Sequence, residues 1–213
     1  MNRVRVIAVL MAATAAAFAA DDDPVNAPYV EKGDCWSYRA ENFPSHHGPI
    51  RDYDLCVNLV DRAKGTILAI ATIKNDGREI DTAWSTEWAT RASVSGVISQ
   101  QGVRYFKFPL HVGDAHTTEY EFRIPRNGAD FLGTARYDMK VAGWEDVTVP
   151  AGTFRALRVE GRGAGVVGDA KTEFTQSITL WYAPKISRHV KLRFQTGRNT
   201  TMSEELTSYR LNQ

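Results

Sequence analysis

Apolar and polar residues alternate with a period of two along most of this chain, which is the pattern of a β-strand with one buried face. The run 66–73 is β-branched and apolar on both faces, and the run 80–88 alternates with Trp84 and Trp88 on its apolar face. The spacing of these two tryptophans also allows a helical turn. Asp76-Gly77 lies between the two runs and predicts a hairpin. Similar alternation recurs at 120–124, 133–141, 174–182 and 190–195.

These segments predict an all-β protein with roughly ten to twelve strands in a single antiparallel curved sheet, a half-barrel or open barrel. The 8 prolines lie at apparent segment edges, where a missing N–H does least harm. Asn127-Gly128 predicts a second hairpin. The glycine-rich stretch 161–165 has no helix pattern behind it, so it is interpreted as a flexible loop between strands rather than a nucleotide site.

A weak internal repeat suggests two similar halves of the sheet. Gly33-Asp34 and Gly113-Asp114 each precede a segment that carries aromatic residues. Because Gly-Asp turns are common, coincidence is the alternative explanation.

The first residues have the pattern of a secretory signal peptide. Arg3 and Arg5 precede an apolar run, and Ala17-Phe18-Ala19 fits the small-x-small rule for cleavage. We predict a signal peptide over residues 1–19, a flexible acidic segment over 20–31 and a single β domain over 32–213. An uncleaved anchor is the alternative. No later stretch is apolar enough for a membrane helix. The alanine-rich apolar run and the arginine-only charged start are typical of bacteria, so the expected location is the periplasm or the outside of a bacterial cell.

Composition excludes several classes of protein. The chain has 26 Lys+Arg against 25 Asp+Glu, so it has no overall charge that would attract nucleic acid. Two cysteines are too few for a disulfide framework or a four-cysteine zinc site. In an oxidising compartment Cys35 and Cys56 are expected to form a disulfide. The alternative, a catalytic thiol, lacks a neighbouring group that would favour the thiolate.

No catalytic residue, metal site or cofactor is predicted from the motifs. His46 and His47 lie in a turn-rich segment, which favours an exposed loop over a metal site. His116 and Asp114 could form a His–carboxylate pair, but no nucleophile accompanies them in the sequence. His189 is expected to point outward at the start of a strand.

The aromatic residues are the more suggestive group, because a curved sheet collects the side chains of one face in a concavity. An apolar ligand such as a lipid, or a segment of a cell-envelope protein, could bind there. The competing interpretation is that these residues form the ordinary core. The candidate ligand-binding residues are Trp36, Trp84, Trp88, Tyr137 and Trp181.

Two motifs resemble a family of exported bacterial proteins. Residues 149–154 (VPAGTF) and 181–184 (WYAP), preceded by 108–114 (FPLHVGD), occur in an order similar to that of the DUF3108 and TapB-like proteins. This chain departs from their pattern at His116, where tryptophan is common. The resemblance implies a β half-barrel or open barrel, similar in outline to periplasmic lipoprotein carriers, and it supplies no catalytic residues.

The sequence therefore predicts an exported, non-enzymatic β-protein that binds an apolar ligand or a cell-envelope partner. Two alternatives remain open. One is a structural or assembly module without a pocket, and the other is a hydrolase that uses His116 and Asp114.

Overall fold

A computed structural model describes residues 23–43, 49–126, 129–197 and 200–212, and these residues form strands almost throughout. The elements are β1 (Cys35–Phe43), β2 (Ile50–Asp61), β3 (Thr66–Ile73), β4 (Glu79–Ser85), β5 (Thr90–Ala92), β6 (Ile98–Val103), β7 (Ala115–Arg126), β8 (Ala129–Val149), β9 (Gly152–Val167), β10 (Thr172–Ala183), the short 3-10 helix η1 (Pro184–Ile186), β11 (Arg188–Thr196) and β12 (Thr200–Arg210). The prediction of an all-β protein is confirmed. No helix in these ranges is long and apolar enough to cross a membrane.

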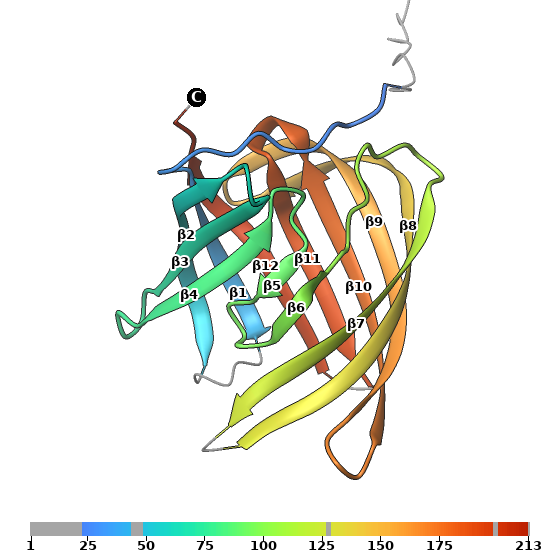
Figure 1. The fold of residues 1–213 in the computed structure, drawn as a ribbon. Coiled ribbons are helices and arrows are strands. Elements are labelled where there is room, and N and C mark those ends of the chain that lie inside the picture. The colour runs from blue at the N-terminus through green and yellow to red at the C-terminus, as the bar shows by residue number, and fades with distance from the viewer. Residues whose placement is uncertain (1–22, 44–48, 127–128, 198–199, 213) are drawn as a thin grey trace, which may run out of the picture.

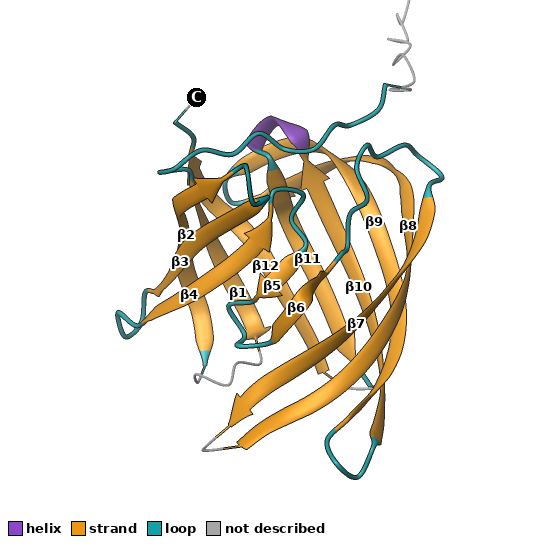
Figure 2. Ribbon diagram, viewed as in Figure 1, coloured by secondary structure: helices purple, strands orange, loops and turns teal. Residues whose placement is uncertain are grey.

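The strands form one antiparallel sheet that closes into a barrel (Figures 1 and 2). Each strand pairs with the next along the chain, and β1 pairs with β12 to complete the circle. The prediction of a half-barrel or open barrel is therefore corrected to a closed one, because the first and last strands supply each other's hydrogen-bonding edge. Pairing is extensive from β7 to β12, whereas β6 and β7 share a single register pair in the described chain, Ile98 with Arg123.

Turn residues determine several of the strand ends as the sequence predicts. Gly77 has a φ of 72° in the hairpin between β3 and β4, a conformation that glycine adopts without strain. Pro150-Ala151 joins β8 to β9, and Phe154 then enters the core. Pro184 follows β10 directly and begins η1. The predicted turn at Asn127-Gly128 lies outside the described residues, and the flanking β7 and β8 pair along their length.

One predicted alternation ends earlier than expected. Trp84 is the last inward residue of β4, and the chain then turns so that Trp88 has a φ of 60°. The hydroxyl of Ser85 accepts hydrogen bonds from the backbone N–H groups of Glu87 and Ala89, which stabilises the turn. Both tryptophans remain buried and meet edge to face.

The two Gly-Asp segments, which the sequence suggests as a repeat, form the same turn. Gly33 and Gly113 both have a φ of 94°. In each turn the glycine N–H donates to the backbone carbonyl of one residue on the neighbouring strand, and the aspartate carbonyl accepts the N–H of that same residue. The residue is Val57 for the first turn and Val141 for the second. Each aspartate side chain also accepts the backbone N–H three residues before it.

The predicted disulfide between Cys35 and Cys56 is present. The two cysteines are direct register partners on β1 and β2, and they are separated by 21 positions in sequence. The bridge therefore joins two neighbouring strands beside the point where the barrel closes.

The segment before β1 crosses one end of the barrel (Figure 1). Val25 forms a β-bridge with Leu110, Val30 is buried, and the carbonyl of Tyr29 accepts the hydroxyl of Ser187. The described part of the acidic segment is thus attached to the barrel, in contrast to the flexible segment that its composition suggests. We refer to this end, covered by residues 25–30 and η1, as the capped end.

Candidate functional site

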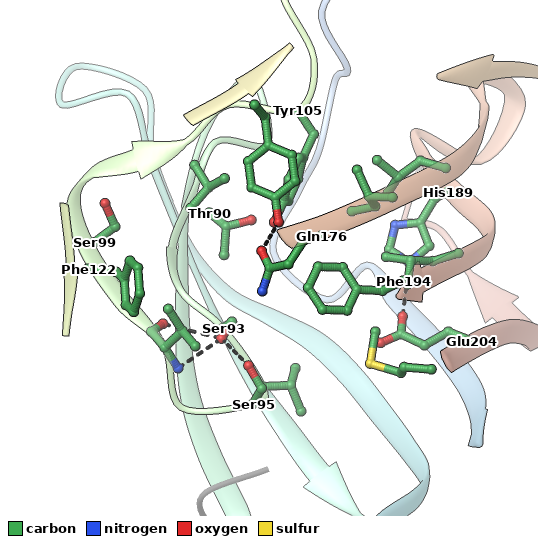
Figure 3. A pocket seen from close by; sticks show the side chains of 18 of the residues that line it. Thr90, Ser93, Ser95, Ser99, Tyr105, Phe122, Gln176, His189, Phe194 and Glu204 are labelled. Carbon is green, nitrogen blue, oxygen red and sulfur yellow. Dashed lines mark hydrogen bonds and ion pairs between the residues drawn. The ribbon is translucent and has the colours of Figure 1, made fainter. Parts of the chain in front are cut away.

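The barrel encloses a cavity of about 440 Å³. It extends from the capped end, near Trp88 and Arg188, towards the opposite end, where Phe43 and Thr196 lie at the rim. We call that opposite end the mouth. Figure 3 shows side chains from strands on different sides of the barrel directed into this space. The residues that line it are Phe43, Tyr53, Trp84, Trp88, Thr90, Ser93, Val94, Ser95, Val97, Ser99, Val103, Tyr105, Phe106, Tyr120, Phe122, Ile124, Tyr137, Val167, Phe174, Gln176, Ile178, Leu180, Arg188, His189, Leu192, Phe194, Thr196, Met202 and Glu204.

Tyrosines form one wall of the cavity. Tyr137 stacks on Tyr120 with ring centroids 6.1 Å apart and meets Tyr105 edge to face. Its hydroxyl donates a hydrogen bond to the side-chain oxygen of Gln176. Burial raises the pKa of Tyr120 to about 12, and it also raises the pKa values of Tyr105 and Tyr137 well above the usual value for tyrosine. All three rings are therefore neutral at physiological pH, and this wall offers an apolar surface.

The glycine-rich stretch 161–165 lies in the middle of β9 and not in a loop, which corrects the sequence interpretation. Gly161, Gly163 and Gly165 occupy alternate positions on the face that continues to Val167 in the cavity wall. A Cβ on Gly163 would lie 2.7 Å from the ring of Tyr137 and 2.6 Å from the carbonyl oxygen of Arg136. The glycines thus let large side chains from β8 and β10 lie flat against the wall.

Two tryptophans anchor the capped end. The indole N–H of Trp36 donates to the carbonyl of Ile186 at 3.0 Å, and that of Trp88 donates to the carbonyl of Ser187 at 2.7 Å. Ser187 has a φ of 56°, so its carbonyl and the following strand are redirected. These bonds hold η1 over the end of the barrel.

Arg188 follows this turn and is 6% exposed. Its guanidinium lies 4.4 Å from the ring centroid of Trp88, 5.0 Å from that of Trp84 and 5.4 Å from that of Trp36. Aromatic faces attract a cation in this way, most strongly when water is excluded. The positive charge is therefore held among apolar rings at the inner end of the cavity.

His189 and Glu204 form a buried pair on β11 and β12. The Nε2 atom of His189 lies 3.2 Å from a carboxylate oxygen of Glu204, and the imidazole stacks on Tyr38 (Figure 3 shows the pair). The expectation that His189 points outward is wrong. The register between β10 and β11 shifts at Val190, and a bulge of this kind turns the preceding side chain to the other face of the sheet.

Burial lowers the pKa of His189, more than the neighbouring Glu204 raises it. The unfolded chain therefore binds a proton at this residue more readily than the folded protein does. The free energy of unfolding is expected to decrease as the pH falls through the ordinary pKa of histidine, about 6.5.

We expect a His189→Gln variant to lose less stability than the wild type when urea unfolding is compared at about pH 7.5 and pH 5.5. A His116→Gln variant is the control, since its ring lies at the surface, and it should keep the wild-type difference. Equal losses for wild type and His189→Gln would contradict this assignment.

The structure separates the five aromatic residues that the sequence groups together. Trp84, Trp88 and Tyr137 line the cavity. Trp36 is fully buried behind it and supports the capped end. Trp181 lies on the outer face of β10, where its N–H donates to Glu145 at 2.7 Å, so it cannot contribute to an internal site.

The proposed His116–Asp114 pair does not form. Asp114 instead accepts the backbone N–H of His111 and lies beside the imidazole of His111, and these contacts lower the pKa of the Asp114 carboxyl. His116 contacts the carbonyl of Arg104. His46 and His47 lie outside the described residues. Within the described ranges, no three His, Cys, Asp or Glu side chains are grouped so that they could hold a metal ion.

Sequence reasoning missed four polar residues of the cavity, which are Gln176, Arg188, His189 and Glu204. Gln176 lies in phase with Phe174 and Ile178, so its inward position could have been found from the alternation. The bulge at Val190 has no comparable signal, which is why the inward turn of His189 could not.

Fold and cavity together define this chain as an antiparallel β-barrel with a largely apolar internal cavity. No family model matches the chain, and no curated protein matches it, so the resemblance to the DUF3108 and TapB-like proteins stays a prediction.

Three solved structures are similar to this chain at low sequence identity. A candidate lipoprotein from Parabacteroides distasonis is 16% identical, with 88% of this chain and 100% of that chain covered and a TM-score of 0.49. An exported protein with a YmcC-like fold from Bacteroides fragilis is 13% identical, with 88% and 100% covered and a TM-score of 0.45. The hypothetical lipoprotein YmcC from Escherichia coli is 8% identical, with 83% and 84% covered and a TM-score of 0.49.

Proposed function

We propose that this chain is an exported binding protein that holds an apolar ligand inside its barrel and catalyses no reaction. The observation that carries the proposal is the cavity of about 440 Å³, which lies within the size range of small-molecule sites. Its wall consists mainly of aromatic and aliphatic side chains. Binding there would remove apolar ligand surface from water, which is the main favourable term for such ligands.

The polar groups of the cavity support binding rather than catalysis. The hydroxyls of Ser93 and Ser95 bond each other at 2.8 Å. His189 bonds Glu204. A serine nucleophile needs a base within hydrogen-bonding reach, and the described residues do not bring these groups together in that way.

Export is supported by two features of the chain. The first 19 residues have the pattern of a signal peptide, which is a prediction from sequence that lies outside the described residues. The Cys35–Cys56 disulfide suits an oxidising compartment.

A cell-envelope partner is a second candidate. Phe131 and Leu132 are 41% and 65% exposed on β8, next to the end of β9 that forms part of the mouth. Exposed apolar side chains of this size can form part of an interface with another protein.

The cavity argues against the alternative of a structural or assembly module that has no pocket.

A cavity-filling variant tests the proposal. Ser99 lines the cavity and is 2% exposed, so Ser99→Phe would place a ring in the space that the ligand needs. We expect the wild type to bind the neutral probe N-phenylnaphthylamine in a fluorescence titration, and Ser99→Phe to bind it about tenfold more weakly. Native mass spectrometry before and after organic extraction should also detect an apolar molecule that copurifies with the wild type.

The matched control is Gln100→Phe, since Gln100 is the exposed neighbour on the same strand. It should bind the probe like the wild type. Melting curves establish that both variants are folded. The proposal fails if the wild type neither binds the probe nor carries a ligand, or if the two variants bind equally well.

A further inference from the structure

The cavity contains a buried arginine, Arg188, that forms no direct ion pair with a described carboxylate. Arg188 is 6% exposed and lines the cavity, and its buried Nε atom has no hydrogen-bond partner among the described residues. No carboxylate of the described residues forms an ion pair with it. A buried charge of this kind is normally paired, so its isolation calls for an explanation.

The aromatic cage supplies only part of that explanation. The rings of Trp84 and Trp88 attract the cation through their faces. The hydroxyl of Tyr38 also interacts with the guanidinium, but a ring face accepts no conventional hydrogen bond, and the guanidinium carries five N–H donors in a planar fork. The fork fits a carboxylate, which can accept two parallel hydrogen bonds.

Glu204, the acidic residue of the same cavity, is already engaged. Its carboxylate lies 3.2 Å from His189, and its proximity also raises the pKa of Tyr53, after the larger effect of burial. Burial keeps His189 neutral, so Arg188 is the one cation among the described residues that line the cavity. A ligand with a single negative charge therefore matches the site better than one with two.

We infer that the cavity binds a long-chain carboxylate, with the carboxylate on Arg188 at the capped end and the chain directed towards the mouth. This inference rests on the proposed function and specifies its ligand. The chain would lie along Tyr137, Phe174 and Phe194, which line the cavity between the two ends. Ser99 Oγ is a second buried polar atom of this cavity that has no partner in the described part of the chain, and it remains available to a bound molecule or water.

Competition between matched ligands tests this inference. Dodecanoate and dodecanol have the same chain and differ in the charged head. We expect dodecanoate to displace N-phenylnaphthylamine from the wild type at a concentration about tenfold lower than dodecanol, as a charge-assisted pair would give. Arg188→Gln should remove this preference, so that dodecanoate and dodecanol displace the probe at similar concentrations.

Three further variants separate recognition from folding. Arg188→Lys keeps the charge and should keep part of the preference, even if Arg188→Gln does not fold. Arg193→Gln removes an exposed cation from the same strand and should keep all of it. Glu204→Gln removes the opposing charge and should strengthen dodecanoate binding relative to dodecanol.

The outcomes distinguish the two proposals. If the wild type binds the neutral probe but shows no preference for dodecanoate, the inference is overturned and the proposed function stands. The inference is also overturned if Arg188→Gln folds and keeps the preference. If the wild type does not bind the neutral probe at all, both proposals fail.

Discussion

A Gly163→Ala variant is expected to lose about 3 kcal/mol of unfolding free energy, near the upper end for an overpacked core position. The new methyl group would lie 2.6 Å from the carbonyl oxygen of Arg136 and 2.7 Å from the ring of Tyr137. The carbonyl belongs to the β8–β9 ladder and cannot move without disrupting it. If Tyr137 moved instead, its hydroxyl would lose the bond to Gln176 and leave a buried polar group unpaired.

The matched control for this variant is Arg162→Ala on the preceding, exposed position of β9. It should remain within about 0.5 kcal/mol of the wild type, as most surface substitutions do. Urea unfolding followed by tryptophan fluorescence measures both values. A Gly163→Ala protein as stable as Arg162→Ala would show that β9 does not pack against Tyr137 in the way described.

Removal of the disulfide by the double substitution Cys35→Ser and Cys56→Ser is expected to cost a similar amount, about 3 kcal/mol. The bridge closes a loop with a sequence separation of 21 and restricts the unfolded chain accordingly. For a chain of this size the melting temperature should fall by roughly 6–12 °C. The loss is expected even though β1 and β2 keep their ladder of hydrogen bonds, because the effect operates mainly on the unfolded state.

The wild type under reducing conditions provides the control for this prediction. It should unfold at the same urea concentration as the double variant, and reductant should leave the double variant unchanged. A reduced wild type that keeps its full stability would mean that the disulfide contributes nothing to the fold.

Much of the barrel could be predicted from local sequence, because each strand pairs with its neighbour in the chain. The alternation at Ile80, Thr82 and Trp84 identifies a strand, and Asp76-Gly77 identifies the hairpin before it. Closure could not be predicted in this way. It depends on the pairing of β1 with β12, in which Cys35 lies opposite Arg210. No pattern within either strand encodes that contact.

The site was predicted less completely than the fold, for a physical reason. Period-two reasoning assigns faces only while the register is unbroken, and the bulge at Val190 reverses the phase on β11. In an unbroken strand His189 would face the side opposite to Leu192 and Phe194, but after the bulge all three face inward. Trp181 shows the opposite case, since its inward neighbours Leu180 and Tyr182 already imply that it faces outward.

The glycines at 161–165 show how the same pattern can be misread. Glycine weakens a strand in isolation, so a cluster of them favours a loop. Their spacing at alternate positions is nevertheless that of one strand face. The side chains that cross them, Tyr137 and Phe174, come from other strands and are not visible in the local sequence.

The covered end of the barrel also determines how the molecule can be attached to something else. The described chain begins at Asp23 beside residues that cross this end, and it finishes there as well, where the N–H of Asn212 donates to Asp34 at 2.8 Å. The mouth lies at the opposite pole. A tag, surface or tether joined at either end of the barrel's chain will therefore leave the entrance to the cavity facing away from it, accessible to a dissolved ligand.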